Sequence, residues 1–400
     1  MSVEITAGPP PDTGGSIGPE AAEAVRAAQA VLSRRVGATV RLAEAEDLGG
    51  STRSVVVRVR VVETPFTLPR TLVIKHYLSS QGTSGVDPFA HEAASCQLFT
   101  ALPPTDRVGP ELVAHDPEKR LVVLEDLGWG PTLEERLFGD DSRAAERALL
   151  GWARALGRLH ATTAGREADF EALLRRLGHR GPQDLVSAQA ARAVHELPEI
   201  LAGVLSVPVP PAVLERAEQA VGLLGNTRFR AFSPSEVCAE NCLVTSRGVR
   251  FLDFEWGCVR DVALDAACFW VPFPSCWSSF AFPPGMAEAM LAAWQAEITS
   301  AWPELTDEVL EPRLMDAELL WVWLLTWWFF GRGSEPEHTR GERPSAEQRA
   351  LALVDRWERL ARRLAPVCPA SADHAQQVAA ALRTRCAVGN RQAPLYPAFR

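Results

Sequence analysis

The feature that most constrains this chain is a pair of short apolar runs within residues 231 to 269. Cys242 to Val244 is followed by a Ser-Arg-Gly turn and then by Val249 to Leu252, a pattern that predicts a β-hairpin. Asn241 precedes the first run, and Asp253 follows the second. Because antiparallel pairing brings the outer ends of a hairpin together, we expect both side chains at one end of the ribbon.

An amide oxygen and a carboxylate at one end of a hairpin can hold a divalent cation. Mg²⁺ takes few protein oxygens and completes its shell with substrate phosphates and water. Kinase-like enzymes hold it with an Asn from the catalytic loop and an Asp from the strand that follows. Asn241 and Asp253 therefore predict a magnesium site for phosphoryl transfer.

This stretch resembles the aminoglycoside and choline phosphotransferase family, whose members have a protein-kinase-like fold. In that family a motif reading His-Gly-Asp, four residues, Asn is followed by Ile-Asp-Phe-Glu. Asn241 matches the Asn of the first motif, and residues 252 to 255 (Leu-Asp-Phe-Glu) match the second. Asp265 matches a downstream Asp, which the resemblance implies braces the loop.

The match departs from the family pattern at the catalytic residue. Pro234, Ser235 and Glu236 occupy the positions of His-Gly-Asp. The added methylene of Glu moves its carboxylate by about 1 to 1.5 Å, which costs on the order of a hundredfold in rate if nothing compensates. The resemblance implies Glu236 as the catalytic base, and the departure leaves a pseudokinase that binds nucleotide and acts as a partner or scaffold as the alternative.

A glycine-rich stretch between two expected strands, Val40 to Ala45 and Ser54 to Val62, is the first candidate phosphate-binding element. Backbone N–H groups of such a turn can bind phosphates, and an ordinary hairpin turn explains the same residues equally well. The resemblance favours the nucleotide loop. Its residues are Gly49, Gly50, Ser51 and Thr52.

An apolar strand, Thr71 to Lys75, ends in a lysine, and Glu92 lies near the start of the next helix. A lysine on such a strand must reach solvent or find an anion. In the kinase fold this lysine binds nucleotide phosphates and pairs with a Glu of the next helix. The resemblance therefore implies that Lys75 and Glu92 form an ion pair at the nucleotide, although either residue alone is more often a solvated charge.

The apolar strand Leu121 to Leu124 is closed by Glu-Asp-Leu-Gly. This resembles the hinge between the lobes of the family, where the backbone of Asp126 and Leu127 would meet the adenine edge. A strand followed by a glycine turn is the plainer interpretation of the same residues.

The rest of the chain is predominantly helical in pattern. Apolar spacing predicts helices over residues 19–36, 144–160, 287–299, 314–330, 346–365 and 372–385. Residues 162–230 are expected to be helical segments broken at Pro182, Pro198 and the cluster at 208–211. Four tryptophans between 321 and 328 can form a cation cage or core, and the all-round apolar helix favours core.

Composition limits the classes of partner. The 400 residues carry 41 basic and 50 acidic side chains, a net charge of −9, which argues against nucleic acid or an anionic membrane as partner. The apolar run Leu319 to Phe330 is too short to span a bilayer, and Met1 to Glu20 lacks the apolar core of a leader peptide. The eight cysteines show no metal or disulfide spacing, so we expect reduced thiols and a cytoplasmic location.

These patterns together predict an α+β fold that is bilobal and protein-kinase-like, with a small antiparallel-sheet N-terminal lobe and a larger helical C-terminal lobe. The expected divisions are a disordered tail at 1–18, a nucleotide-binding lobe and hinge at 19–128, the helical lobe at 129–388 and a tail at 389–400. The expected activity is phosphate transfer from ATP or GTP with Mg²⁺. The acceptor is a hydroxyl of a small molecule, or of Ser or Thr in a precursor peptide served by a partner lyase.

Overall fold

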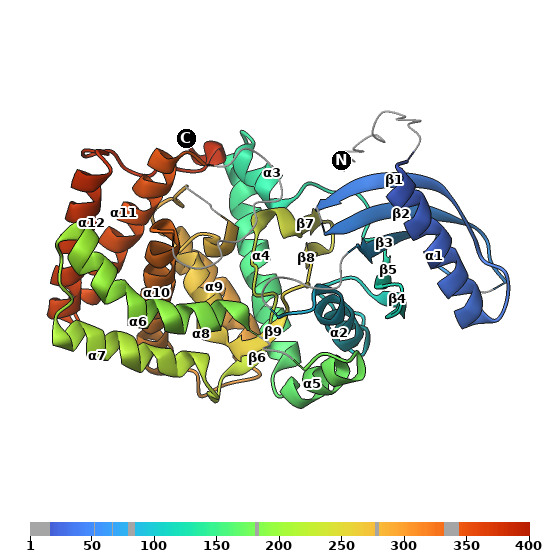
Figure 1. Ribbon diagram of the computed structural model, residues 1–400, viewed down its shortest axis with the longest axis horizontal. Helices are drawn as coiled ribbons and strands as arrows, with labels where there is room; N and C mark the ends of the chain where they lie inside the picture. Colours follow the sequence, from blue (N-terminus) through green and yellow to red (C-terminus); the bar gives the residue numbers. More distant parts are fainter. Residues whose placement is uncertain are drawn as a thin grey trace, which may run out of the picture. The chain divides into compact units, whose positions relative to one another are not determined.

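The computed structural model describes residues 17–51, 53–65, 67–78, 85–180, 184–276, 280–331 and 344–400 (Figure 1). They divide into two compact units. Unit 1 comprises Met1–Leu78 and Ala114–Asp126, and unit 2 comprises Ser79–Val113 and Leu127–Arg400. The predicted disordered tail at 1–18 lies almost entirely outside the described residues.

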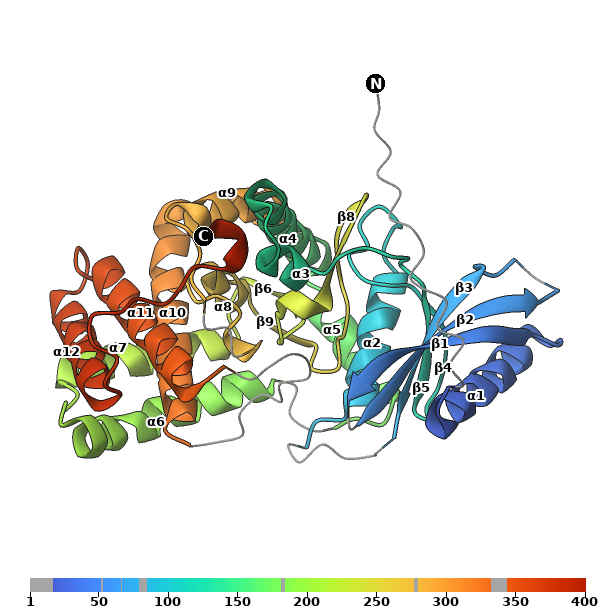
Figure 2. The ribbon, with the colours of Figure 1, turned by 90° about the horizontal axis from the view of Figure 1, so that it is seen from above.

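Unit 1 is built on a five-stranded sheet with the order β1-β2-β3-β5-β4, in which β1 pairs antiparallel with β2, β2 with β3, and β3 with β5. Helix α1 packs along this sheet (Figure 2). The strand β4 passes from unit 2 into unit 1. The elements are α1 (Pro19–Val36), β1 (Arg41–Ser51), β2 (Ser54–Glu63), β3 (Thr71–Tyr77), β4 (Leu112–Asp116) and β5 (Leu121–Glu125).

Helix α1 spans the predicted residues, because its start and stop signals are both local. Pro19 opens the helix, where its missing N–H needs no partner. Gly37 ends it in a left-handed conformation, with a φ of 70°, and its N–H caps the Ser33 carbonyl. The buried face of the helix carries Ala24, Ala28, Val31 and Leu32.

Unit 2 is mostly helical and holds two small antiparallel strand pairs, β6 with β9 and β7 with β8. Figures 1 and 2 show α6, α7, α10, α11 and α12 gathered into one bundle, while α4 packs beside α9. The helices are α2 (Pro88–Thr100), α3 (Leu133–Phe138), α4 (Ser142–Thr163), α5 (Glu167–Arg176), α6 (Leu185–Leu205), α7 (Pro211–Ala220), α8 (Val262–Ala266), α9 (Met286–Ile298), α10 (Asp307–Phe329), α11 (Ala346–Leu364) and α12 (Pro369–Arg385). The strands are β6 (Arg230–Ser233), β7 (Cys242–Thr245), β8 (Gly248–Phe251) and β9 (Cys258–Asp261).

The predicted fold class is confirmed: unit 1 carries the antiparallel sheet and unit 2 is the larger, helical unit. The tryptophans of α10 are core, as predicted. Trp323 is fully buried, and the indole N–H groups of Trp321 and Trp328 donate to the Leu264 carbonyl and to Gln189 at 2.7 and 2.6 Å. Among the described helices, none combines the length and the hydropathy needed to cross a membrane.

The prediction that Pro198 breaks the chain into two helices is wrong, because α6 continues through it. A proline inside a helix removes one backbone hydrogen bond and crowds the preceding turn. The apolar face on both sides of Pro198 is buried, and it includes Val194, Leu197 and Leu201. Tertiary packing thus holds a helix that local preference would interrupt. Pro182, the other expected break, lies outside the described residues.

The prediction that all eight cysteines are free thiols is also wrong. Cys238 and Cys276 form a disulfide, with their Cα atoms 5.7 Å apart. The two residues are 38 positions apart in the chain, and sequence spacing does not show which distant cysteines approach each other in space. The remaining six cysteines, all among the described residues, form no disulfide.

The last residues of the chain belong to unit 2 and pack against the rest of it. The Ala281 N–H donates to the Pro394 carbonyl at 2.9 Å, and Ala281 bridges to Leu395. Tyr396 is buried and stacks on Phe282 with ring centroids 5.5 Å apart. The C-terminal segment is therefore anchored at its aromatic residue.

Candidate active site

The hairpin β7–β8 brings the two predicted metal ligands to one end of a ribbon. Cys242 pairs with Phe251 in the ladder. One residue further out, the Leu252 N–H donates to the Asn241 carbonyl at 2.7 Å. Asn241 therefore lies beside the residue that precedes Asp253, and both side chains are half-buried.

The donor atoms at this end suit magnesium. The amide oxygen of Asn241 and the carboxylate of Asp253 are hard oxygen ligands, and two such groups leave most of an octahedral shell to phosphates and water. The described residues contain no group of three or more His, Cys, Asp or Glu side chains that could hold a metal ion by themselves. This hairpin end fits a metal that arrives with a phosphate-bearing ligand better than a closed structural site.

Asp253 and Ser235 both have left-handed backbone conformations, with φ values of 62° and 64°. A non-glycine residue seldom adopts this conformation, although Asp does so more readily than most. Such positions cluster where a fold fixes functional side chains against local preference. One of them is a predicted metal ligand and the other precedes the predicted base.

The loop that carries Glu236 consists of consecutive tight turns. The Glu236 N–H donates to the Pro234 carbonyl at 2.8 Å, and the Cys238 N–H donates back to the Glu236 carbonyl at 3.0 Å. The Asn241 N–H then donates to the Cys238 carbonyl at 3.1 Å. These consecutive turns connect Glu236 to Asn241, the predicted metal ligand, and the Glu236 side chain is half-buried.

The buried carboxylate of Asp265 holds this loop through a network of hydrogen bonds. Asp265 accepts hydrogen bonds from the Ser233 hydroxyl at 2.9 Å, from Arg260 Nε at 2.9 Å and from His160 Nε2 at 3.0 Å. The Ser235 N–H donates to Ser233 Oγ, and Arg260 Nη2 donates to the Ser235 carbonyl at 3.3 Å. Both backbone groups of Ser235 are thus tied to the Asp265 network.

The charge state of the network follows from its contacts. Burial opposes ionisation of Asp265, but the Arg260 charge and the His160 hydrogen bond lower its pKa to about 2. The Trp294 indole N–H donates to His160 Nδ1 at 3.0 Å, so Nε2 carries the ring proton. The brace is an ionised aspartate held by an arginine and a histidine of fixed tautomer, in the position that the family resemblance implied for Asp265.

Glu92 has a partner that no sequence signal indicated. It is buried in α2, and its Oε2 accepts a hydrogen bond from the Phe254 N–H at 2.9 Å. Phe254 immediately follows Asp253, so Glu92 contacts the backbone beside the predicted metal ligand, within unit 2. Its predicted pairing with Lys75, which belongs to unit 1, stays a prediction.

In unit 1 the predicted lysine and Gly49 lie in register, on either side of the same residue of β2. Val56 of β2 pairs with Gly49 on one side and with Lys75 on the other. Lys75 is buried in the middle strand β3, and its Nζ lies 5.1 Å from the centre of the Tyr77 ring. Gly50 must be glycine, because a Cβ there would lie 2.2 Å from the Ser54 carbonyl oxygen.

The prediction that the turn begins at Gly49 is wrong. Gly49, Gly50 and Ser51 continue the β1 ladder, since they pair with Val56, Val55 and Ser54. The ladder persists because glycine adopts the φ values of 88° and 152° found here. The Gly49 N–H donates to Asp47 Oδ1 at 2.8 Å. Thr52 lies outside the described residues.

Asp126, at the predicted hinge, uses its carboxylate within unit 1. Arg58 Nε donates to Asp126 Oδ2 at 3.0 Å, and Arg58 Nη1 donates to Glu46 at 3.1 Å. The contact of the Asp126 backbone with adenine stays a prediction. Leu127 is the first residue of the second segment of unit 2 and is half-buried.

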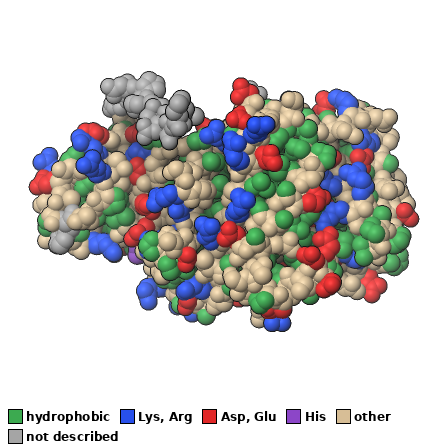
Figure 3. All heavy atoms as spheres, turned by 180° about the vertical axis from the view of Figure 1, so that it is seen from behind, with side chains coloured by type: hydrophobic (Ala, Val, Ile, Leu, Met, Phe, Trp, Pro, Cys, Tyr) green, Lys and Arg blue, Asp and Glu red, His purple; other side chains and the backbone are tan. Residues whose placement is uncertain are grey.

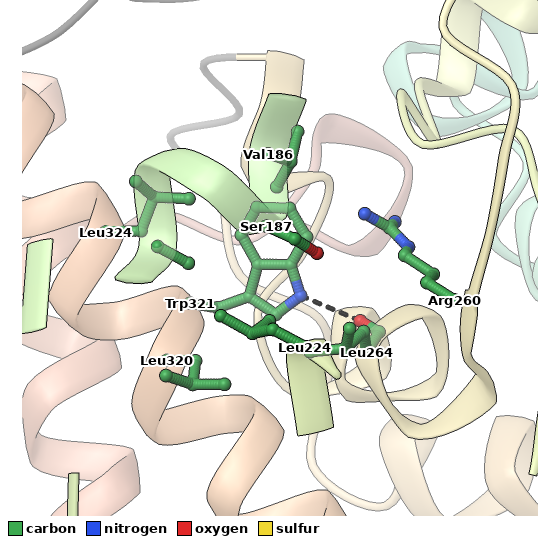
Figure 4. Close-up of a pocket in the computed structure, with 9 residues that line it drawn as sticks. Val186, Ser187, Leu224, Arg260, Leu264, Leu320, Trp321 and Leu324 are labelled. Carbon is green, nitrogen blue, oxygen red and sulfur yellow. Dashed lines mark hydrogen bonds between the residues drawn. The ribbon is translucent and has the colours of Figure 1, made fainter. Parts of the chain in front are cut away.

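A small pocket in unit 2 lies beside the Asp265 brace (Figure 4). Arg260 stands at its edge, and the Trp321 indole crosses it to reach the Leu264 carbonyl. The cavity volume of about 10 Å³ is that of about one water molecule. The pocket is therefore too small for a nucleotide or a substrate.

No family model matches the chain, and no curated protein matches it. Solved structures do. A Plasmodium vivax ethanolamine kinase is 12% identical with a TM-score of 0.46, over 82% of this chain and 84% of its own. A choline/ethanolamine kinase family protein from Mesorhizobium loti is 16% identical with a TM-score of 0.43, over 90% and 99%. A thermostable mutant of an aminoglycoside phosphotransferase is 13% identical with a TM-score of 0.41, over 89% and 98%. These proteins belong to the group that the motifs resemble, and at such identities and scores we take nothing about substrate from them.

Proposed function

We propose that this chain is an ATP-dependent phosphotransferase that acts on a hydroxyl group. The observation that carries the proposal is the hairpin end, where Asn241 and the residue before Asp253 share a 2.7 Å hydrogen bond. A loop of consecutive turns joins this end to Glu236. Phosphoryl transfer needs a carboxylate base held near a magnesium site, and this loop joins Glu236 to the two proposed magnesium ligands.

The proposed nucleotide contacts are those that the resemblance implies. Lys75 and the stretch Gly49 to Thr52 bind the phosphates, and the backbone of Asp126 and Leu127 binds the adenine edge. The resemblance supports these assignments, as does the placement of Gly49 and Lys75 at one level of the sheet. The proposed role of Glu92 is to pair with Lys75 while it holds the Phe254 N–H.

In the proposed reaction, Glu236 accepts the proton of the acceptor hydroxyl as the oxygen bonds to the γ-phosphorus of ATP. The bond from that phosphorus to the bridging oxygen breaks, and ADP leaves with the electron pair. Asn241 and Asp253 would hold Mg²⁺, which when bound neutralises phosphate charge. The hydrogen bonds at both backbone groups of Ser235 support the proposal that this loop accommodates the longer Glu.

We propose a small molecule, or a Ser or Thr of a precursor peptide with a partner lyase, as the class of acceptor. GTP is the alternative donor. Acidic and basic side chains are interspersed over the face seen in Figure 3, which suits a small or peptide ligand better than nucleic acid. A cytoplasmic location stays a prediction.

The deciding experiment is calorimetric titration with ATP, with and without Mg²⁺, followed by phosphate-transfer assays over a panel of hydroxyl compounds and peptides. We expect Asp253→Ala to abolish the metal-dependent part of nucleotide binding. Glu236→Gln should keep the affinity and lose transfer, because the base acts only at the chemical step. The exposed residues Asp373 and Glu218 supply matched controls, Asp373→Ala and Glu218→Gln, which should change neither quantity.

Two outcomes contradict the proposal. If nucleotide binding depends on Mg²⁺ in Asp253→Ala as it does in the wild type, the proposed magnesium site is wrong. If the wild type and Glu236→Gln transfer phosphate at equal rates, Glu236 is not the catalytic base. Tight Mg-nucleotide binding without transfer to any member of the panel would instead identify a pseudokinase, the alternative considered from the sequence.

A further inference from the structure

The turn that follows Asp253 is held at both ends by two consecutive residues of α2. Glu92 Oε2 accepts from the Phe254 N–H at 2.9 Å, and His91 Nδ1 lies 2.7 Å from the Gly257 carbonyl oxygen. The turn itself is closed by a hydrogen bond from the Gly257 N–H to the Phe254 carbonyl at 2.9 Å. All of these residues belong to unit 2, and His91 and Glu92 are fully buried.

The hydrogen bond to Gly257 fixes the tautomer of His91. A carbonyl oxygen only accepts, so Nδ1 of His91 must carry the proton. Its Nε2 lies 3.3 Å from Nε2 of His179, which must then be the donor of that second bond. The His91 ring is neutral in this arrangement, because its Nε2 accepts. Burial lowers the pKa of His91 to about 4, in agreement with a ring that stays uncharged.

Helix α2 packs closely against Gly257 of this turn. A Cβ on Gly257 would lie 2.6 Å from both the Phe232 ring and the Ser95 hydroxyl. Ser95 in turn donates to the His91 carbonyl at 2.6 Å. The Gly257 carbonyl is therefore presented to His91 by close packing, and no longer residue fits at position 257 without moving α2.

We propose that His91 is a positioning residue for the magnesium ligand Asp253. The inference rests on the proposed function, because it takes Asp253 as a metal ligand. By holding the Gly257 carbonyl while Glu92 holds the Phe254 N–H, His91 fixes the turn that sets the left-handed backbone of Asp253. Magnesium requires near-ideal octahedral geometry, so a small rotation of this carboxylate against Asn241 weakens binding. A residue that orients a metal ligand in this way typically contributes 10- to 100-fold in metal affinity.

The test compares His91→Asn with His91→Gln. The Asn amide nitrogen takes the place of Nδ1 and can donate to Gly257, whereas the Gln amide nitrogen takes the place of Nε2 and cannot. We expect His91→Gln to raise the Mg²⁺ concentration that half-saturates nucleotide binding by about tenfold. His91→Asn should stay within about threefold of the wild type, and nucleotide affinity without Mg²⁺ should be the same in all three.

A second variant, Gly257→Ala, disturbs the same contact without touching His91 and decides the matter if His91→Gln does not fold. It should raise the Mg²⁺ requirement by about the same factor. Equal Mg²⁺ requirements in His91→Gln, Gly257→Ala and the wild type would overturn the inference and leave the proposed function standing. A wild-type protein whose nucleotide binding does not depend on Mg²⁺ would overturn both.

Discussion

Replacing Asp265 by Asn tests the idea that one buried carboxylate holds the candidate catalytic loop. Asn keeps the shape of the side chain but removes the charge that faces Arg260, whose guanidinium is almost fully buried. Removing one partner of a buried ion pair costs about 3 to 5 kcal/mol. The Arg260 charge also lowers the pKa of Asp265 to about 2, so the folded protein favours the charged, paired carboxylate. We therefore expect a loss of about 3 kcal/mol in the free energy of unfolding.

Urea unfolding followed by tryptophan fluorescence measures this loss, since Trp294 reaches the same network through His160. Asp373→Asn is the matched control, because Asp373 is exposed, and it should leave the midpoint unchanged. Adding Arg260→Met to Asp265→Asn should restore part of the stability, since the unpaired buried charge is then gone. A loss below about 1 kcal/mol in the free energy of unfolding of Asp265→Asn would refute the reasoning, because a buried arginine charge without its carboxylate partner should destabilise the fold by more than that.

Three further predictions concern stability. Cys276→Ser removes the link to Cys238, which closes a loop of 38 residues, so it should lower the free energy of unfolding by about 4 kcal/mol; a reductant should lower the wild-type midpoint and leave that of the variant unchanged. His374 is buried, neither ring nitrogen has a hydrogen-bond partner among the described residues, and burial lowers its pKa to about 4. The stability that comes from keeping this ring neutral is fully present above pH 6.5 and is lost as the pH falls towards 4. In His374→Leu the urea midpoint should therefore change less with pH over that range. Gly50→Ala should lower the melting temperature and weaken nucleotide binding, because its Cβ would meet the Ser54 carbonyl, whereas Gly203→Ala, with open space around it, should do neither.

The elements that the sequence predicted well are those with local signals. Helix α1 has the predicted bounds because Pro19 and Gly37 mark its two ends. The β7–β8 hairpin was visible because two apolar runs flank a short polar turn, and it determines where Asn241 and Asp253 lie. One short stretch of sequence can thus specify that two candidate ligands lie at one end of a hairpin.

The features that the sequence did not reveal depend on approach between distant segments. Cys238 meets Cys276 across 38 residues, and Glu92 meets Phe254 across 162. Pro198 misled for a related reason, since buried packing on α6 outweighs the local preference of proline. The glycine stretch was assigned to a turn because glycine is common in turns, whereas Gly50 is required by its contact with Ser54.

The departure from the family motif at Pro234, Ser235 and Glu236 takes on a different meaning once the loop is seen in space. Ser235 is buried, and its N–H and carbonyl both have partners in the Asp265 network. Ser235 also holds a left-handed φ of 64°, a conformation that persists only where surrounding contacts enforce it. The chain therefore constrains the residue immediately before Glu236 as tightly as it constrains Asp253. This constraint on the backbone beside Glu236 is the reason to regard the Glu as part of a loop built around it.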